Sequence, residues 1–274
     1  MEECFREKFI YNNDIKSSKE FDLFNPNGGK SLYEVLRIVE GVPLFLEDHL
    51  ERLENSAEVT SLKLWMKKDE IKNKIYKLCK VNDIFFGNIK LIFNYKEDES
   101  ENFLAYFIKH KYPSKDMYEE GVATALYHAE RENPNAKVIN SKLREDTNNF
   151  IREKNIYEAI LVDNDGYITE GSRSTIFAIK GDKVYTSPIK DVLPGITRKY
   201  VLKVCKQLDI DAIEERIHHT NIDDIDSFFI CGTSPKILPI HKVDHIKCDI
   251  NNCILEKIKL GYDNIIKQYI NFNK

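Results

Sequence analysis

Two residues of opposite charge, Lys137 and Glu170, stand near the two ends of one central stretch of the chain. Lys137 opens Lys-Val-Ile-Asn, just after the turn signal 133–135, and Glu170 opens Glu-Gly-Ser. A lysine amine attacks a carbonyl carbon only when it is neutral, which requires a lowered pKa. Most lysines are solvated surface charges, and a glutamate beside a glycine is usually a turn residue. Taken alone, each residue therefore supports the surface interpretation.

The elements between these two residues can be read from the pattern of apolar residues. A charged segment with helical character follows Lys137, and the apolar run 159–162 after it predicts a buried strand. The sequence Asp-Asn-Asp-Gly at 163–166 then predicts a hairpin turn. We therefore expect the lysine to precede a helix and the glutamate to follow a strand.

This order of elements resembles the core of the fold-type IV (class IV) aminotransferases, which use pyridoxal 5′-phosphate (PLP). The family pattern reads Lys-x-x-Asn, a helix, a Glu-Ala-apolar strand, and Thr-Glu-Gly-Ser before a second apolar strand. The resemblance implies that Lys137 forms a Schiff base with PLP and that Glu170 contacts the pyridine nitrogen. Lys142 is the competing lysine, but the residues after it match nothing in the pattern.

Further matches imply the other contacts of PLP, which needs phosphate donors and packing for its ring. The resemblance implies cofactor contacts from Arg52, Ser174, Thr175, Leu193, Gly195, Ile196, Thr197 and Thr233. It implies substrate contacts from Tyr33, Lys90 and Ser234. Thr175 departs from the family, which usually has asparagine there, but a hydroxyl can still donate a hydrogen bond. For Arg52 alone the alternative is a solvated helix face, and Lys90 is equally well explained as a solvated strand residue.

The flanking sequence predicts the elements that position these residues. Residues 31–39, 89–95 and 103–110 are expected to form strands, and 43–60 and 68–80 to form helices. In the first helix Leu46, Leu50, Leu53 and Ala57 share the apolar face, with His49, Arg52 and Ser56 along its flank. Helices are also expected after Gly195 and over 252–271.

The length allows two domains or one large one, and the mixture of hairpins and single helices predicts two α/β or α+β domains. The chain has 274 residues, of which 42% are hydrophobic and 31% charged, and a net charge of −4. We expect a small N-terminal α+β domain over 1–112, a linker over 113–119 and a larger PLP-binding α/β domain over 120–274, with the cofactor in the cleft between them. Interspersed charges give no basis for a nucleic-acid partner or a membrane partner.

The six cysteines are scattered, and no secretory signal precedes them, so reduced thiols in the cytoplasm are expected. No metal is expected, since His241, His245, Cys248 and Cys253 fit no common zinc spacing. The segment 28–31 resembles the end of a phosphate-binding loop, but Phe24 stands where that motif requires glycine.

The resemblance implies a homodimeric aminotransferase that exchanges an amino group between an amino acid and a 2-oxo acid. The apolar run around Lys90 favours L-amino acids with apolar side chains. Alternatives on the same scaffold are aminodeoxychorismate lyase, which eliminates pyruvate, and D-amino acid aminotransferase. A PLP-carrying binding protein without turnover is a further alternative, which the filled catalytic positions disfavour.

Overall fold

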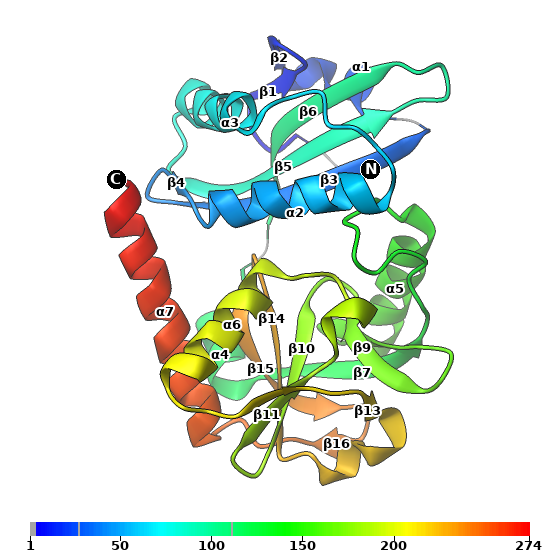
Figure 1. Cartoon of the computed structure of the whole chain (residues 1–274), viewed down its shortest axis with the longest axis vertical. Coiled ribbons are helices and arrows are strands. Elements are labelled where there is room, and N and C mark those ends of the chain that lie inside the picture. The colour runs from blue at the N-terminus through cyan, green and yellow to red at the C-terminus, as the bar shows by residue number, and fades with distance from the viewer. Residues whose placement is uncertain (1–3, 27, 111) are drawn as a thin grey trace. The chain divides into compact units, whose positions relative to one another are not determined.

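The computed structural model describes residues 4–26, 28–110 and 112–274, and the chain divides into two compact units (Figure 1). The first unit comprises residues 1–111, 136–139 and 267–274, and the second comprises 112–135 and 140–266. The short segment 136–139, which contains Lys137, therefore belongs to the first unit, although its neighbours in sequence belong to the second.

The described residues of the first unit form a six-stranded sheet in the order β2-β1-β6-β5-β3-β4, with all neighbours antiparallel. Its strands are β1 (Lys8–Tyr11), β2 (Asp14–Ser17), β3 (Lys30–Val39), β4 (Val42–Pro43), β5 (Phe86–Tyr95) and β6 (Glu101–Ile108). A 3-10 turn, η1 (Ser18–Glu20), and the short helix α1 (Phe21–Phe24) connect β2 to β3. The predicted strands are confirmed, with shifts of a few residues at their ends.

Two helices, α2 (Leu46–Val59) and α3 (Lys68–Asn82), build the apolar core of the first unit with the sheet. The predicted apolar face of α2 is buried in this core, together with alternate residues of β3 and β5 such as Leu32, Leu36 and Leu91. Because side chains alternate along a strand, the residues between these face the other side of the sheet. The helix predicted from 43 begins later, because Pro43 belongs to β4.

The second unit contains a ten-stranded mixed sheet in the order β12-β11-β10-β14-β15-β7-β8-β9-β13, with β16 paired to β15. Its strands are β7 (Val122–His128), β8 (Glu158–Val162), β9 (Tyr167–Gly171), β10 (Thr175–Lys180), β11 (Lys183–Thr186), β12 (Ala212–Glu214), β13 (Ile217–His218), β14 (Ser227–Gly232), β15 (Lys236–Val243) and β16 (Ile246–Lys247). The parallel pairs are β7 with β8, β7 with β15 and β11 with β12. The mixed α/β class is therefore confirmed.

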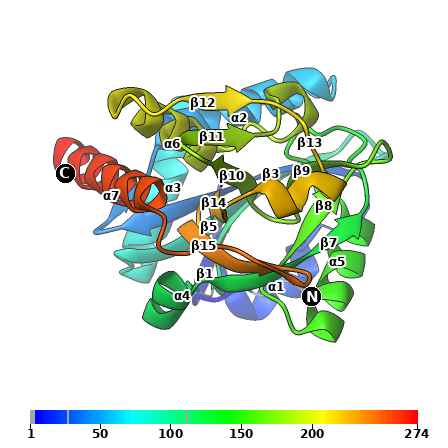
Figure 2. The ribbon, with the colours of Figure 1, turned by 90° about the horizontal axis from the view of Figure 1, so that it is seen from below.

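Helices and short 3-10 turns complete the second unit: α4 (Lys115–Glu120), α5 (Ser141–Lys154), η2 (Ile189–Asp191), α6 (Ile196–Gln207), η3 (His219–Asp224) and α7 (Cys253–Asn273), whose last turns count with the first unit. Helix α6 contacts β14 and β12, α5 contacts β8, and α4 contacts β15, as can be followed in Figure 2. Helix α4 lies within the stretch interpreted as a linker, where the Ser114 side chain caps it by accepting from Met117 N. No helix in the described ranges is long and apolar enough to cross a membrane.

The hairpin between β8 and β9 sets the position of Glu170. Asp163 turns the chain by accepting from Tyr167 N at 2.8 Å, and Gly166 has a φ of +88°. The positive φ favours glycine, and a Cβ on Gly166 would lie 2.4 Å from His218 Nε2, so the imidazole would have to move. The predicted turn is confirmed, and Glu170 follows the strand β8 as expected, although it also lies inside the next strand, β9.

Candidate active site

Lys137 is fixed through its backbone on both sides. Tyr33 N–H donates to Lys137 O at 3.0 Å, and Ile139 N–H donates to Ser31 O at 3.0 Å, so the segment pairs with the start of β3. Lys137 N–H donates to Ser56 Oγ of α2, also at 3.0 Å. The lysine therefore stands on a short strand-like segment held between a sheet edge and a helix. The competing Lys142 is exposed on α5.

Two lysine amines lie near one aromatic ring in the first unit. Lys137 Nζ is 4.5 Å from the centroid of Tyr33, and Lys90 Nζ is 5.1 Å from it. Lys90 pairs in register with Val35 of β3, which places it on the same face of the sheet as Tyr33. Only 5% of Lys90 is exposed, so its interpretation as a solvated strand residue is wrong.

Arg52 of α2 forms a buried ion pair in the core of the first unit. Its Nε donates to Glu34 Oε1 at 2.8 Å and its Nη2 donates to Glu34 Oε2 at 2.7 Å. His49 Nδ1 lies 2.7 Å from Glu34 Oε2. Arg52 is 7% exposed, so the solvated-face alternative is wrong, and its two parallel hydrogen bonds fix the orientation of the guanidinium.

The charges of this cluster follow from burial and pairing. Burial alone would raise the pKa of Glu34, but the charge and hydrogen bonds of Arg52, together with His49, hold it far below its usual range. Burial lowers the pKa of His49 despite its bond to Glu34. His49 is therefore neutral near pH 7, and because an ionised carboxylate only accepts, its Nδ1 carries the proton.

Glu34 was missed at the sequence level, although the sequence contains a signal for it. It occupies the inward phase of β3, between the buried residues Leu32 and Leu36, where a charged residue requires a partner. A glutamate at an inward-facing position of an otherwise apolar strand face therefore predicts a nearby cation. Arg52 and His49 of α2 supply the contacts.

In the second unit, Glu170 is buried in β9 with 4% exposure, which excludes the turn interpretation. Its Oε1 lies 2.7 Å from Arg131 Nε, and Arg131 Nη2 donates to Ser172 O at 3.2 Å. Arg131 had no sequence signal, because it lies in an irregular segment beside the 133–135 turn. The arginine brings positive charge to the buried carboxylate.

A second buried carboxylate, Glu158 of β8, supports the loop after Glu170. It accepts from Arg173 N at 2.5 Å and from Ser172 Oγ at 3.2 Å. Burial raises the pKa of Glu158 above its ordinary value, in spite of these donors. A Cβ on Gly171 would lie 2.3 Å from Ser174 Oγ, so the Glu-Gly-Ser sequence folds tightly over Glu158.

The amino end of α6 is a second feature of this unit. Gly195 is the N-cap and provides no side-chain cap, and the first turn contains no acidic residue. A Cβ on Gly195 would lie 2.7 Å from Thr175 Oγ1, so only glycine allows this approach. Ile196 and Thr197 are buried in the first turn. An uncapped helix start of this kind can bind an anion.

The remaining predicted residues of the second unit lie on connections. Leu193 is half-buried just before α6, and Thr233 and Ser234 are half-buried in the turn that joins β14 to β15. The first unit thus brings together Lys137, Tyr33, Lys90 and Arg52. The second unit carries Glu170, Ser174, Thr175, Leu193, Gly195, Ile196, Thr197, Thr233 and Ser234.

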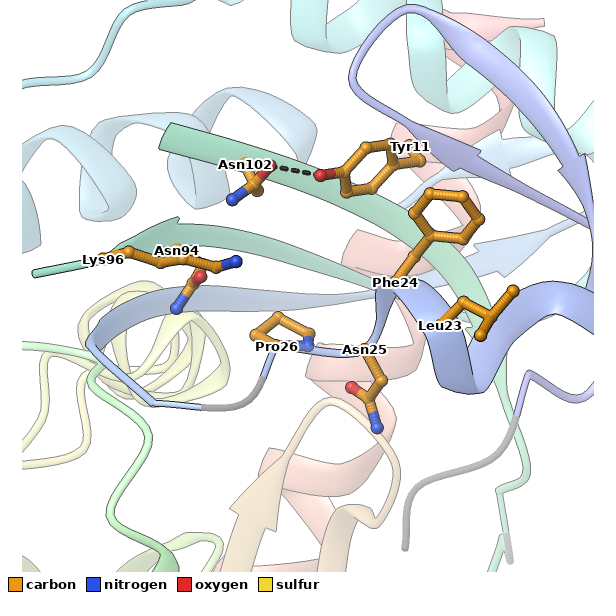
Figure 3. A pocket seen from close by; sticks show the side chains of 8 residues that line it. All are labelled: Tyr11, Leu23, Phe24, Asn25, Pro26, Asn94, Lys96 and Asn102. Atoms are coloured by element: carbon orange, nitrogen blue, oxygen red, sulfur yellow. Dashed lines mark hydrogen bonds between the residues drawn. The ribbon is translucent and has the colours of Figure 1, made fainter. Parts of the chain in front are cut away.

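A pocket of about 130 Å³ in the first unit lies apart from these residues (Figure 3). It is lined by Tyr11, Leu23, Phe24, Asn25, Pro26, Asn94, Lys96 and Asn102, none of which was predicted to act in chemistry. Among the residues that the structure describes, no group of three or more His, Cys, Asp or Glu side chains could hold a metal ion.

Comparison with known proteins covers most of the chain. A D-alanine aminotransferase of Bacillus licheniformis is 26% identical over 79% of this chain and 80% of its own length. An aminodeoxychorismate lyase of Bacillus subtilis is 25% identical over 80% of this chain and 79% of its own. The crystal structure of a branched-chain aminotransferase from Thermoproteus uzoniensis with norvaline superposes with a TM-score of 0.85, at 21% identity, over 97% of this chain and 98% of that one.

The fold agrees with this last relative, which at such low identity indicates the architecture alone. The family model described as amino-transferase class IV matches residues 31–243, which is most of the chain. The family uses PLP as its cofactor. The chain therefore belongs to the class IV aminotransferases and is a PLP-dependent enzyme.

Proposed function

We propose that this aminotransferase moves an amino group between an L-amino acid with an apolar side chain and a 2-oxo acid, with Lys137 as its catalytic amine. The observation that carries the proposal is the placement of Lys137. Its backbone is bound on both sides, and its amine lies 4.5 Å from the Tyr33 ring, whereas Lys142 is exposed.

The residues present fit PLP. The glycine N-cap of α6 leaves the helix start without a side-chain cap, as an anion site requires, and Gly195 lies where a Cβ would meet Thr175. Gly195, Ile196, Thr197 and Thr233 would hold the phosphate, together with Arg52. Leu193 would pack against the ring, and Ser174 and Thr175 would line it. When bound, PLP supplies an electron-withdrawing ring that stabilises charge at the amino acid's α-carbon.

Each remaining residue has a separate role in this proposal. Lys137 would hold the cofactor through its amine and would also move the proton at the substrate's α-carbon. Glu170, which lies beside Arg131, would contact the ring nitrogen and help to hold a proton there. Tyr33, Lys90 and Ser234 orient the substrate, with the Lys90 ammonium facing its carboxylate.

The proposal that the substrate has an apolar side chain is supported more by the relatives of this chain than by the strand that contains Lys90. Ile89, Leu91 and Phe93 pack into the core with α2 and α3, so they lie on the opposite face from Lys90. The apolar run therefore says less about the substrate pocket than the sequence suggested. Sequence relatives named as probable branched-chain-amino-acid aminotransferases, 28% and 30% identical to this chain, support an apolar side chain on the substrate.

We also propose a homodimer that works in the cytoplasm. The family resemblance supports the dimer, and the six cysteines, all free in the structure, are compatible with a reducing compartment. Sedimentation at several protein concentrations measures the oligomeric state, and cell fractionation measures the location.

The test of the substrate is a screen of L- and D-amino acids against 2-oxoglutarate and pyruvate, with aminodeoxychorismate assayed beside them. L-leucine is expected to react faster than D-alanine or D-glutamate. Faster turnover of either D-amino acid, or consumption of aminodeoxychorismate alone, would contradict the proposed substrate while leaving the PLP chemistry intact.

A further inference from the structure

The catalytic lysine and the phosphate arginine proposed above are joined by a closed chain of contacts within the first unit. Lys137 N–H donates to Ser56 Oγ at 3.0 Å, and Ser56 O–H donates to Arg52 O at 2.8 Å. Arg52 binds both oxygens of Glu34, at 2.8 and 2.7 Å. The residue before Glu34 is Tyr33, whose N–H donates back to Lys137 O at 3.0 Å.

Ser56 occupies the junction of this circuit. A helical serine often donates to the carbonyl four residues earlier, and its proton is used in that bond to Arg52. Its oxygen is then left as an acceptor, and the donor it meets lies 81 residues further along the chain. Ser56 is fully buried, so water cannot replace it as the acceptor for Lys137.

Glu34 closes the circuit on the side of the sheet that faces α2. Adjacent strand residues face opposite sides, so the Tyr33 ring lies near the Lys137 amine on one face while Glu34 reaches α2 on the other. The bidentate bond to Arg52 therefore couples the orientation of α2 to the strand that holds Lys137. A shift of α2 along its axis would move Arg52 and Ser56 together, because Ser56 lies one turn further on in the same helix.

We propose that Ser56 and Glu34 are positioning residues that hold Lys137 and Arg52 in one fixed arrangement. Neither touches the substrate in this scheme. They act through the two residues to which the proposed function, on which this inference rests, gives direct contact with the cofactor. Misplacing the amine by about 1 Å can lower the rate on the order of a hundredfold, so contacts that fix the backbone of Lys137 support catalysis.

The test uses Ser56→Ala and follows the backbone amide of Lys137 by hydrogen exchange in the PLP-loaded enzyme. Without its acceptor, that amide should exchange roughly tenfold faster or more. The rate of the half-reaction with an amino acid should fall about tenfold, while KM changes less than kcat.

Thr60→Val is the matched control. Thr60 lies one turn further along α2 and makes the same kind of bond, donating to Ser56 O at 2.7 Å. It belongs to no step of the circuit, so its loss should leave Lys137 exchange and the kcat to KM pattern unchanged. Equal exchange in Ser56→Ala and wild type, or equal acceleration in both variants, would overturn the proposal.

Two results distinguish an error in the positioning role from an error in the assignment of Lys137 as the catalytic amine. If borohydride fixes PLP on Lys137 but Ser56→Ala leaves that amide protected, only the positioning role is wrong. If PLP is fixed on another lysine, the assignment of the amine is wrong, and the positioning role is overturned with it.

Discussion

Each unit contains a buried glutamate beside an arginine, and the two pairs differ in burial. In the first unit both oxygens of Glu34 are bound by Arg52, and His49 adds a third contact. In the second, Glu170 Oε1 lies 2.7 Å from Arg131 Nε. The side chains of Glu34 and Arg52 are 0% and 7% exposed, against 5% and 18% for Glu170 and Arg131.

This difference separates a structural role from a chemical one. Two charged hydrogen bonds from Arg52 and one contact with His49 offset the cost of burying the Glu34 carboxylate completely. The role of this charge is therefore to stabilise the core of the first unit. The pair in the second unit places a partly exposed arginine beside a carboxylate in a buried strand, and the ring nitrogen of PLP requires a carboxylate nearby. Removing each charge should therefore damage a different property.

The largest expected effect is on stability, from Glu34→Gln. The substitution keeps the shape but leaves the Arg52 charge buried without its anion, which should lower the free energy of unfolding by about 3–5 kcal/mol. Urea unfolding measures this, with Glu51→Gln, at an exposed position of α2 next to Arg52, as the control. A loss below about 1 kcal/mol would mean that Arg52 is stabilised by other groups.

Glu170→Gln should have its main effect on rate. The amide cannot keep the ring nitrogen protonated, so the half-reaction with an amino acid should slow by about a hundredfold, equivalent to about 2.7 kcal/mol. Its stability should change far less than that of Glu34→Gln. Stopped-flow absorbance measures the rate, and a near-native value would place the essential carboxylate elsewhere.

The pH dependence of stability tests the neutral state of His49. Its folded-state pKa lies below the ordinary 6.5, so below pH 6.5 the unfolded chain takes up a proton that the folded protein refuses. Stability should be fully present above pH 6.5 and fall as the pH drops, by at most about 1.4 kcal/mol per pH unit. His110, whose pKa burial also lowers, acts in the same direction.

The variant His49→Asn isolates the contribution of that histidine. Its amide can still donate to Glu34 but does not titrate, so the slope between about pH 6.5 and 5.5 should become shallower. An unchanged slope would assign the pH dependence to other groups.

The smallest effect is expected from Glu158→Gln. The pKa of Glu158 is raised by burial, and its hydrogen-bond donors include the Arg173 backbone N–H and the Ser172 hydroxyl. A glutamine oxygen can accept the same bonds, so stability should change by less than about 1 kcal/mol. Half-reaction rates measured beside Glu170→Gln should stay within a few-fold of wild type.

Much of the first unit could be predicted from local pattern. The 3.6-residue spacing of Leu46, Leu50, Leu53 and Ala57 identified α2 and its buried face, and the same helix geometry placed His49, Arg52 and Ser56 on one flank. The hairpin before Glu170 was equally clear, because Asp163 and Gly166 carry the turn chemistry themselves.

Contacts between distant segments could not be read in the same way. The bridge between Leu32 and Val138 makes the Lys137 segment part of the first unit, but Val-Ile after a lysine has no periodicity that predicts its partner. The contact made by Arg131 could not be predicted either, because burial is inferred from regular helix or strand spacing and Arg131 lies in an irregular segment. Resemblance to the family supplied residue roles that pattern alone did not.

The most direct test of the central assignment is to reduce the PLP-loaded enzyme with borohydride and map the modified peptide. The geometry around Lys137 predicts a stable PLP label on that residue and none on the exposed Lys142. A label on Lys142 would contradict the assignment of the catalytic amine, and with it the register proposed for the central stretch.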